Sequence, residues 1–416
     1  MLKLVKLLLG LTLALVLIVA VAVAGALFYF DPNQHKDFIT GQVEKATGRS
    51  FAITGPITLS YYPWLGVQAS GITLGNAQGF GDTPFLQVDS VALRIKTLPL
   101  LQKHYELDTF RLHGMKLNLA RKQDGTTNWS DLAGEDKKQR EGLPLAAVVL
   151  GGVDVKDGQL TWQDATAPQT ITLSKLNVTT GELTYGAPIN LEATLKATAT
   201  SPALASDVKL NGTLNYNLEA QTYSFKPIDL NARLSGKSVP GGATNLQFQA
   251  AVESDLKQDQ ARIADLSLDV LGARVQGGLT VARITSNKPQ VQGDLAIQGK
   301  DILPLLQMLE SPAAKDLARL ADRSFDVQLG FDADMQSGSL KVPAFTAGVL
   351  GASIQGSIEA SDFQSKTPAA RGMLKAAGPD LPALLQIAGQ FETGKEPRLA
   401  GYGKRLADAQ GRAFDV

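Results

Sequence analysis

Apolar and polar residues alternate along most of this chain after about residue 50, and this period of two limits its fold more than any other feature. Successive side chains of a β-strand point to opposite faces of the sheet, so strict alternation predicts a strand with one apolar and one polar face. The pattern therefore predicts a mainly β protein. The clearest predicted strand covers 207–218, where the apolar positions are Val208, Leu210, Gly212, Leu214, Tyr216 and Leu218.

The same alternation recurs in other segments, with turn-forming residues between them. One wet and one dry face is typical of antiparallel sheets, whereas parallel sheets covered by helices have continuous apolar strands. We therefore predict an antiparallel sheet with a few short helices, the first of them at 36–48. The further predicted strands are 91–96, 115–119, 189–197 and 325–333, and the predicted turns are Asp124-Gly125, Asp157-Gly158 and Pro240-Gly241-Gly242.

The chain also repeats itself with an offset of 79 residues and no gap. Each copy contains several predicted strands followed by a short apolar helix, at 302–310 and 381–388. Repeats of this kind stack into elongated sheets, and roughly 20 strands at about 4.8 Å spacing would extend for about 100 Å. The first identities in register are Val270-Leu-Gly-Ala273 with Val349-Leu-Gly-Ala352, Gln276-Gly277 with Gln355-Gly356, and Leu305-Leu306-Gln307 with Leu384-Leu385-Gln386.

Residues 7–30 form an uncharged, predominantly apolar run that follows Lys3 and Lys6. A helix of this length is about 36 Å long, enough to cross a hydrocarbon core of roughly 30 Å. Lysines beside a membrane span favour its cytoplasmic side. We therefore predict a single-pass anchor in a bacterial inner membrane, with the N-terminus cytoplasmic and the bulk of the chain in the periplasm.

A cleaved signal peptide is the alternative interpretation of this segment. Ala22-Val23-Ala24 resembles the small-residue site at which such peptides are cut. The apolar run continues for six residues beyond this site, which a spanning helix requires and a signal peptide does not. This length favours the uncleaved anchor.

Composition excludes several classes of function. Forty basic residues balance forty acidic ones, so no overall positive charge favours nucleic acid as a partner. The chain has no cysteine, and therefore neither disulfides nor thiolate metal ligands.

A charged segment bracketed by glycines interrupts the alternation near residue 140 and is predicted to be a linker or loop. The predicted divisions are a cytoplasmic tip and transmembrane anchor (1–30), an N-terminal unit (31–132), the charged linker (133–144), a continuation of the sheet (145–244), a first repeat (245–323), a second repeat (324–390) and a C-terminal tail (391–416).

Groups that could carry catalysis are scarce. The three histidines, His35, His104 and His113, do not stand at metal-ligand spacing from one another. Partial matches to a phosphate-binding loop at 231–238 and 389–396 each lack a residue that the loop requires, and 332–334 lacks the turn glycine of a calcium loop. We predict no catalytic residue, no metal, no cofactor and no enzymatic activity.

The remaining candidate site is the apolar side of the predicted sheet. In the N-terminal unit we expect this side to form an ordinary packed core. In the repeats the predicted helices are too few to cover it, so we expect an open groove that could shelter acyl chains. The predicted lining residues are Val208, Leu210, Leu214, Leu246, Phe248, Val275, Leu279, Phe325, Val327 and Leu329.

Several short motifs, taken jointly, resemble the AsmA family of inner-membrane-anchored envelope proteins, which is related to bridge-like lipid-transfer proteins. The resemblance covers essentially the whole chain and is sharpest in residues 1–132. Its motifs are the Lys-flanked anchor, Gly41-Gln-Val-Glu-Lys-Ala-Thr-Gly48-Arg49, Phe51-Ala-Ile-Thr-Gly-Pro56, Tyr62-Pro63-Trp64-Leu65-Gly66-Val67, Ile72-Thr-Leu-Gly75-Asn76, Val88-Asp89-Ser90-Val91, Leu98-Pro99-Leu100-Leu101, Leu112-His113-Gly114 and Asp124-Gly125-Thr-Thr-Asn128-Trp129.

The resemblance implies an inner-membrane anchor and a long, curled β-sheet with an apolar interior, and it brings no catalytic residues. Typical members continue further than Val416, so we expect a short or truncated member. A groove of this length would need partner proteins or oligomers to complete a path between two membranes.

Two functions remain open at this stage. The first is a periplasmic scaffold that binds or transfers phospholipid in outer-membrane biogenesis, with the inner membrane and phospholipid as partners. The alternative is a structural or chaperone-like factor that assists outer-membrane protein assembly, with outer-membrane or other envelope proteins as partners.

Overall fold

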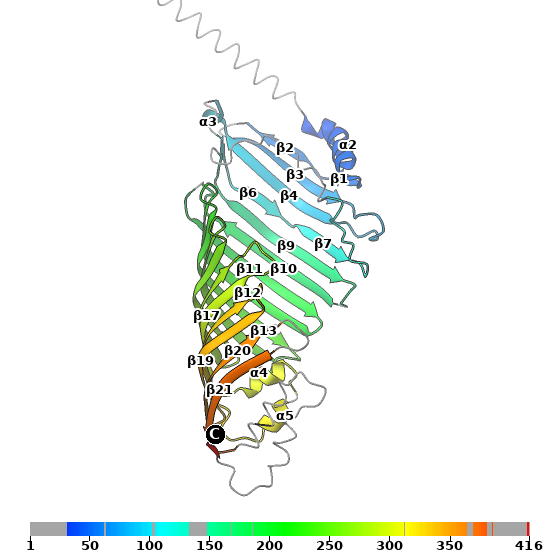
Figure 1. The fold of residues 1–416 in the computed structure, drawn as a ribbon. Helices are drawn as coiled ribbons and strands as arrows, with labels where there is room; N and C mark the ends of the chain where they lie inside the picture. The colour runs from blue at the N-terminus through cyan, green and yellow to red at the C-terminus, as the bar shows by residue number, and fades with distance from the viewer. Residues whose placement is uncertain are drawn as a thin grey trace, which may run out of the picture.

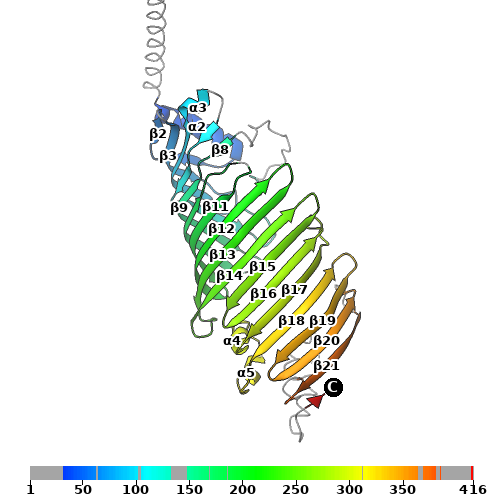
Figure 2. The same ribbon diagram turned by 90° about the vertical axis from the view of Figure 1, so that its left-hand side faces the viewer.

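The computed structural model describes residues 31–61, 64–101, 105–132, 148–167, 169–184, 186–311, 313–363, 369–380, 385 and 414–415. Its strands form one continuous sheet of 22 strands, which curls along its length (Figure 1). The strands succeed one another across the sheet essentially in chain order, and Figure 2 shows β11–β21 side by side in that order. The prediction of a mainly β protein with one extended sheet is confirmed.

The N-terminal end of the sheet carries the first described helices. Helix α2 (Lys36–Thr47) follows a 3-10 turn, η1 (Pro32–His35), and ends at Gly48, whose φ of 69° is the left-handed conformation that glycine adopts without strain. This confirms the helix predicted at 36–48. The next elements are β1 (Phe51–Ile53), β2 (Ile57–Ser60), β3 (Trp64–Leu74), β4 (Leu86–Lys96) and α3 (Thr97–Leu101).

The prediction of a wholly antiparallel sheet is wrong at one place. Strands β5 (Tyr105–Leu107), β6 (Phe110–His113) and β7 (Lys116–Arg121) all pair antiparallel with β4. On their other side they pair in parallel with β8 (Val148–Leu150) and β9 (Val153–Asp164). Parallel neighbours need a crossover of a dozen or more residues, and the long connection after β7 provides it.

The predicted turn at Asp157-Gly158 is also wrong, because both residues lie inside β9. Asp157 has a φ of 51°, and the pairing of β9 with β10 (Gln169–Thr180) shifts register next to Gly158. The pair therefore forms a β-bulge, for which a residue with positive φ followed by glycine is as suitable as for a turn. Turns are confirmed at Asp124-Gly125 and Pro240-Gly241-Gly242.

From β9 onward every strand pairs antiparallel with the strand before it, so the sheet is a simple meander. The predicted strands at 207–218, 189–197 and 325–333 are confirmed. The bounds are β11 (Ile189–Thr200), β12 (Ala203–Asn217), β13 (Thr222–Gly236), β14 (Ala243–Asp255), β15 (Gln260–Val270), β16 (Ala273–Ala282), β17 (Gln290–Gly299), β18 (Phe325–Asp334), β19 (Ser339–Val349), β20 (Ala352–Ser361) and β21 (Ala369–Gly378).

The internal repeat is visible in these bounds. Strands β19, β20 and β21 begin and end 79 residues after β15, β16 and β17. The turns repeat as well, because Leu271-Gly272 and Leu350-Gly351 both have positive φ at each residue, as in a type I′ hairpin turn. The two copies therefore share strand lengths and turn geometry within one sheet.

Two short helices connect β17 to β18, namely α4 (Leu303–Met308) and α5 (Ala313–Leu317). Helix α4 confirms the helix predicted at 302–310, and α5 follows it. The predicted second helix at 381–388 and the linker at 133–144 lie outside the described residues, apart from Leu385.

The last described strand, β22 (Phe414–Asp415), repeats an earlier pairing. Phe414 pairs with Gly378 at the end of β21, as Phe325 pairs with Gly299 at the end of β17. The sequences around the two phenylalanines also agree, because Phe-Asp-Val follows an arginine by two positions in each case. The first residue of β22 thus pairs as the first residue of β18 does.

The predicted membrane anchor at 7–30 lies outside the described residues. Within the described part of the chain, every helix is too short or too polar to cross a bilayer.

Buried apolar residues are found along the whole sheet, and those of its middle are Ile189, Ile228, Val239, Ala250 and Ala273. In the N-terminal unit the buried side chains include Ile57, Leu74, Phe85 and Val88. At the far end, Leu306 of α4 and Leu317 of α5 form a small cluster with neighbouring residues. Among the described residues, Leu317 and Asn128 are the largest side chains with less than 2% of their surface exposed.

Candidate functional site

The ten residues predicted to line a groove all lie on one face of the sheet. Residues that pair directly in antiparallel strands share a face, and so do residues two apart in one strand. Val208 and Leu210 of β12 connect to the other eight by such steps across β12–β18. The face they share is named the apolar face here.

Five rows of residues run across the strands of the apolar face, from β11 to β21. The first row is Leu195, Val208, Ala232, Leu246, Val270, Ala273, Gly299, Phe325, Val349 and Ala352. The second is Ala193, Leu210, Leu230, Phe248, Leu268, Val275, Ile297, Val327, Ala347, Ile354 and Ala376.

Between the third and fourth rows the pairing of several strands shifts register, but the residues remain on the same face. The third row is Leu191, Gly212, Ile228, Ala250, Leu266, Gly277, Leu295, Leu329, Phe345, Gly356 and Leu374. The fourth is Ile189, Leu214, Phe225, Val252, Ile263, Leu279, Gly293, Phe331, Val342, Ile358 and Gly372. The fifth is Tyr216, Tyr223, Ser254, Ala261, Val281, Val291, Ala333, Leu340, Ala360 and Ala370.

None of the residues in these five rows is charged. Charge is found on the opposite face, where ions of opposite sign stand directly across from each other. Lys196 lies 2.6 Å from Asp207, and Arg274 lies 2.7 Å from Asp269. Such exposed pairs contribute little to stability, at most about 1 kcal/mol each. They show, however, that this face is the one that meets water.

The apolar face is only partly shielded. Nine of the ten predicted lining residues are half-buried, and Phe325 alone is fully buried, with 6% of its surface exposed. Among the described residues, the helices that could cover the sheet beyond β9 are α4 and α5, at its far end. The middle of the apolar face therefore has no second layer within the described part of the chain.

Phenylalanine rings on this face lie across glycines of the neighbouring strand. A Cβ added at Gly299 would be 2.5 Å from a ring carbon of Phe325, and one at Gly212 would be 2.3 Å from the ring of Phe225. Gly356 and Phe345 are related in the same way. Because glycine has no side chain, it leaves room for the phenylalanine ring to lie over the neighbouring strand. The ring therefore occupies the space that a side chain at the glycine would take.

The residues considered for metal binding do not come together. His113 lies 3.5 Å from Asp157, His104 lies outside the described residues, and Asp332 accepts hydrogen bonds from Gln290 and Gln292. Asp334 forms an ion pair with Arg283 at 2.6 Å. No group of three metal-ligating side chains exists in the part of the chain that is described.

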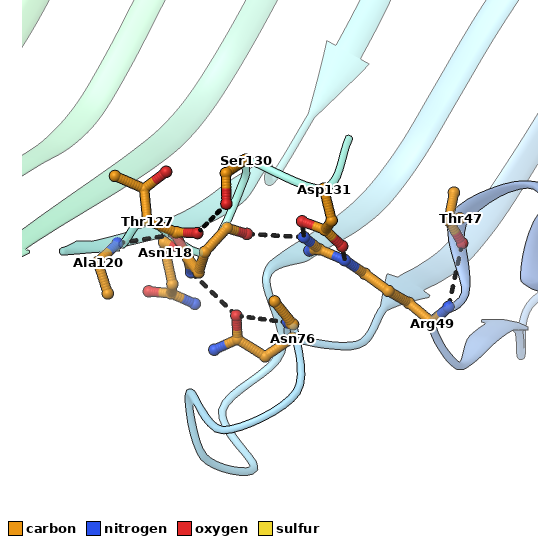
Figure 3. Close-up of polar contacts among 10 residues, drawn as sticks. Thr47, Arg49, Asn76, Asn118, Ala120, Thr127, Ser130 and Asp131 are labelled. Carbon is orange, nitrogen blue, oxygen red and sulfur yellow. Dashed lines mark hydrogen bonds and ion pairs between the residues drawn. The ribbon is translucent and has the colours of Figure 1, made fainter. Parts of the chain in front are cut away.

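A buried polar network in the N-terminal unit escaped sequence analysis (Figure 3). Arg49, which follows α2, is 4% exposed and donates two hydrogen bonds to Asp131, from Nε at 2.9 Å and from Nη2 at 2.5 Å. Its Nη2 also donates to the carbonyl of Asn128 at 2.7 Å. The hydrogen bonds from Arg49 lower the pKa of Asp131.

Asn128 is the centre of this network and is fully buried. Its Oδ1 accepts from the backbone N–H of Ala120 at 2.9 Å, and its Nδ2 donates to Asn76 and to the carbonyl of Asn118. The guanidinium of Arg49 lies 4.7 Å from the centre of the Phe85 ring. Arg49, Asn76 and Asn128 each belong to a motif that signalled the family resemblance, so the network explains what those motifs do.

The comparisons with known proteins support that resemblance. The family model described as the AsmA family matches residues 1–281. The AsmA family protein YhjG of Escherichia coli (strain K12) is 28% identical over 130 residues, which cover 28% of this chain and 19% of that protein. The chain thus aligns with about a fifth of the length of this relative, and no solved structure matches. With the family model covering more than half of its length, the chain belongs to the AsmA family.

Proposed function

We propose that this protein is a membrane-anchored envelope scaffold whose apolar face binds phospholipid acyl chains and lets them pass along the sheet. The observation that carries this proposal is the uncharged, partly uncovered apolar face that continues through β11–β21. Removing an acyl chain from water contributes about 0.8 kcal/mol per methylene group, so such a face can hold lipid without specific polar contacts.

The proposed mechanism is passive. Acyl chains lie against the apolar face while head groups remain in water, and no covalent bond is made or broken. The rows of side chains continue from strand to strand without a charged residue, so a lipid that moves along them meets no abrupt electrostatic barrier. No catalytic group, metal or cofactor is required.

The proposal places the protein beside its lipid source. Residues 7–30 would anchor it in a bacterial inner membrane, with Lys3 and Lys6 on the cytoplasmic side and the sheet in the periplasm. From there the sheet would contribute to outer-membrane biogenesis, together with partner proteins that complete the path.

A charge on the apolar face tests the proposal. Leu210→Asp and Val327→Asp should lower the phospholipid that copurifies with the full chain by about tenfold or more, since a loss of 1.4 kcal/mol suffices for that factor. Matched controls are Asn211→Asp and Gln328→Asp, which add the same charge one residue away on the polar face. Lipid is quantified by mass spectrometry.

Absence of phospholipid from the wild-type protein would contradict the proposal. So would equal lipid content in the apolar-face variants and their controls, provided that circular dichroism shows all four to be folded.

One observation favours the alternative function in outer-membrane protein assembly. Among the described residues, the outer edge of β21 is paired only at Ala377 and Gly378, and Met373 and Leu374 are 78% and 62% exposed. An open edge of this kind can accept an extended chain by strand addition. A photo-cross-linking residue at Met373 that captures unfolded outer-membrane proteins in cells, with one at Gln355 of β20 as control, would support this alternative.

A further inference from the structure

We propose that a phospholipid on the apolar face lies across the strands, with its head group at the rim next to the fifth row and its acyl chains directed toward the first row. This inference rests on the proposed function and adds the orientation of the bound lipid. It follows from a difference between the two rims of the apolar face, which are named the helix rim (beside the first row) and the open rim (beside the fifth row).

The helix rim is covered by protein beside β19 and β20. Leu350, in the turn between β19 and β20, packs against the cluster formed by Leu306 of α4 and Leu317 of α5. Val349 and Ala352 of the first row line one cavity together with Leu320, which follows α5. Three side chains of the first row are buried, with exposed fractions of 4% for Ala273, 6% for Phe325 and 5% for Ala352, and the others are half-buried.

Two turns at the helix rim are also short, and a third is partly buried. Leu271-Gly272 and Leu350-Gly351 are two-residue turns without a charged or hydroxyl side chain. Val239, in the turn between β13 and β14, is 3% exposed. Beside α4 and α5, a phosphate would have to displace packed apolar side chains, so this covered part of the rim is unfavourable for a head group.

Within the described residues, the open rim is uncovered and carries amphipathic side chains. Its fifth row contains Tyr216 and Tyr223, which pair directly and are half-buried. Tyrosine suits a boundary between apolar chains and water, because its ring is apolar and its hydroxyl is polar. The described residues leave this rim uncovered, and Leu218 and Leu256 in its turns are 40% and 39% exposed.

Polar and charged residues occupy the turns beyond the fifth row. Arg283 pairs with Asp334, and Asp259 accepts hydrogen bonds from the backbone and hydroxyl of Thr285. Lys257 and Lys288 lie in the same set of turns. Both signs of charge are therefore present in turns that the described residues leave uncovered, which suits a zwitterionic or anionic head group surrounded by water.

The width of the apolar face permits this orientation. From Ala261 in the fifth row to Val270 in the first row, β15 advances about 30 Å at roughly 3.3 Å per residue. The acyl chains of one leaflet occupy about half of a 30 Å hydrocarbon core. A lipid with its head at the open rim would therefore place its chain ends near the third row, at Leu266.

The chain has no cysteine, so single cysteines can report the orientation. We would introduce Ala261→Cys, Leu266→Cys and Val270→Cys separately into the full chain and mix each protein with phosphatidylethanolamine vesicles. One vesicle preparation contains a lipid with a maleimide on its head group, and the other a lipid with a maleimide at the end of an acyl chain. Each rate is divided by the rate with a small water-soluble maleimide.

The head-group reagent is expected to favour Ala261→Cys over Val270→Cys by about tenfold, a ratio that corresponds to 1.4 kcal/mol. The acyl-end reagent should favour Leu266→Cys over Ala261→Cys. On β19 the equivalent positions are Leu340, Phe345 and Val349, which lie in the fifth, third and first rows. Cysteines there should give the same order even if a β15 variant fails to fold.

Equal or reversed head-group rates at Ala261 and Val270 would overturn the orientation while leaving lipid binding intact. Gln276→Cys places a cysteine on the polar face as a control. If the two lipid reagents react no faster with the cysteines of the apolar face than with this control, the proposed function itself fails. The two failures are thus distinguishable.

Discussion

Arg49 and Asp131 are 82 residues apart in the chain and are joined by two hydrogen bonds, so that the segment after α2 is fastened to the segment after β7. The Arg49 side chain is almost completely buried, whereas that of Asp131 is 43% exposed. The pair therefore depends on Asp131 to neutralise a guanidinium that water cannot reach.

Replacing the acid of this pair should destabilise the N-terminal unit. Asp131→Asn leaves the Arg49 charge buried without its counter-ion, and we expect a loss of about 2 kcal/mol in unfolding free energy, below the 3–5 kcal/mol of fully buried pairs because Asp131 is partly solvated. Urea unfolding measures the loss, with Asp82→Asn at an exposed loop position as the control. Equal stability of the two variants would contradict this account.

The contact of Phe325 with Gly299 should behave as a coupled pair. Gly299→Ala places a methyl group where the ring lies, and such overpacking costs about 1–3 kcal/mol. Phe325→Leu frees that space, so the double variant should lose less stability than the sum of the single variants. A double-mutant cycle of unfolding free energies tests this coupling, and simple additivity would show that the ring is not held against the glycine.

Asp301 should make part of the stability depend on pH. Arg323 donates to it at 2.8 and 2.7 Å, and the N–H of Leu303 at the start of α4 donates at 2.9 Å. The hydrogen bond from Arg323 is the main cause that lowers the pKa of Asp301 in the folded state. Stability from this carboxylate is therefore present above its ordinary pKa of about 3.9 and is lost as the pH falls through the lower folded value.

Asp301→Asn should accordingly cost about 1 kcal/mol at pH 7, a modest value because the carboxylate is partly exposed, and nothing at an acidic pH below the folded-state pKa. Thermal unfolding at both pH values gives the comparison. A wild-type advantage that persists at the acidic pH would assign the stability to something other than this ionised group.

The N-terminal segment yields a separate prediction. If residues 7–30 span the inner membrane, the full chain should resist extraction by alkaline carbonate, and deletion of residues 1–30 should release it. Mass spectrometry of the intact purified protein checks the alternative. A mature N-terminus directly after Ala24 would identify a cleaved signal peptide.

Periodicity predicted the apolar face correctly because it is a property of each strand alone. The residues Val208, Leu210 and Leu214 share a face whenever β12 is a strand, whatever lies beside it. Whether the apolar sides of neighbouring strands form one common face depends on the register of their pairing, which the sequence does not specify. In β15, for example, a bulge around Asp265 lets Ile263 and Leu266 share a face although they are three residues apart.

Features that depend on distant residues could not be predicted. Nothing local indicates that Arg49 meets Asn128 and Asp131, since these contacts form only when the segment after β7 folds back toward α2. The parallel pairing of β9 with β6 and β7 likewise depends on the path of a long connection. Asp157-Gly158 shows the limit of turn signals, because the same dipeptide serves in a bulge.

The meander of β9–β21 has a consequence for how such a protein changes in evolution. From β10 onward, each strand there pairs, within the described residues, only with the strands immediately before and after it. A duplication of a whole block of strands therefore leaves the earlier pairings unchanged. Phe325 and Phe414 pair in the same way with the glycine that ends the strand before them, so one strand pairing is used twice. Length in this architecture is thus an adjustable quantity, which selection can match to the distance that the sheet has to cover.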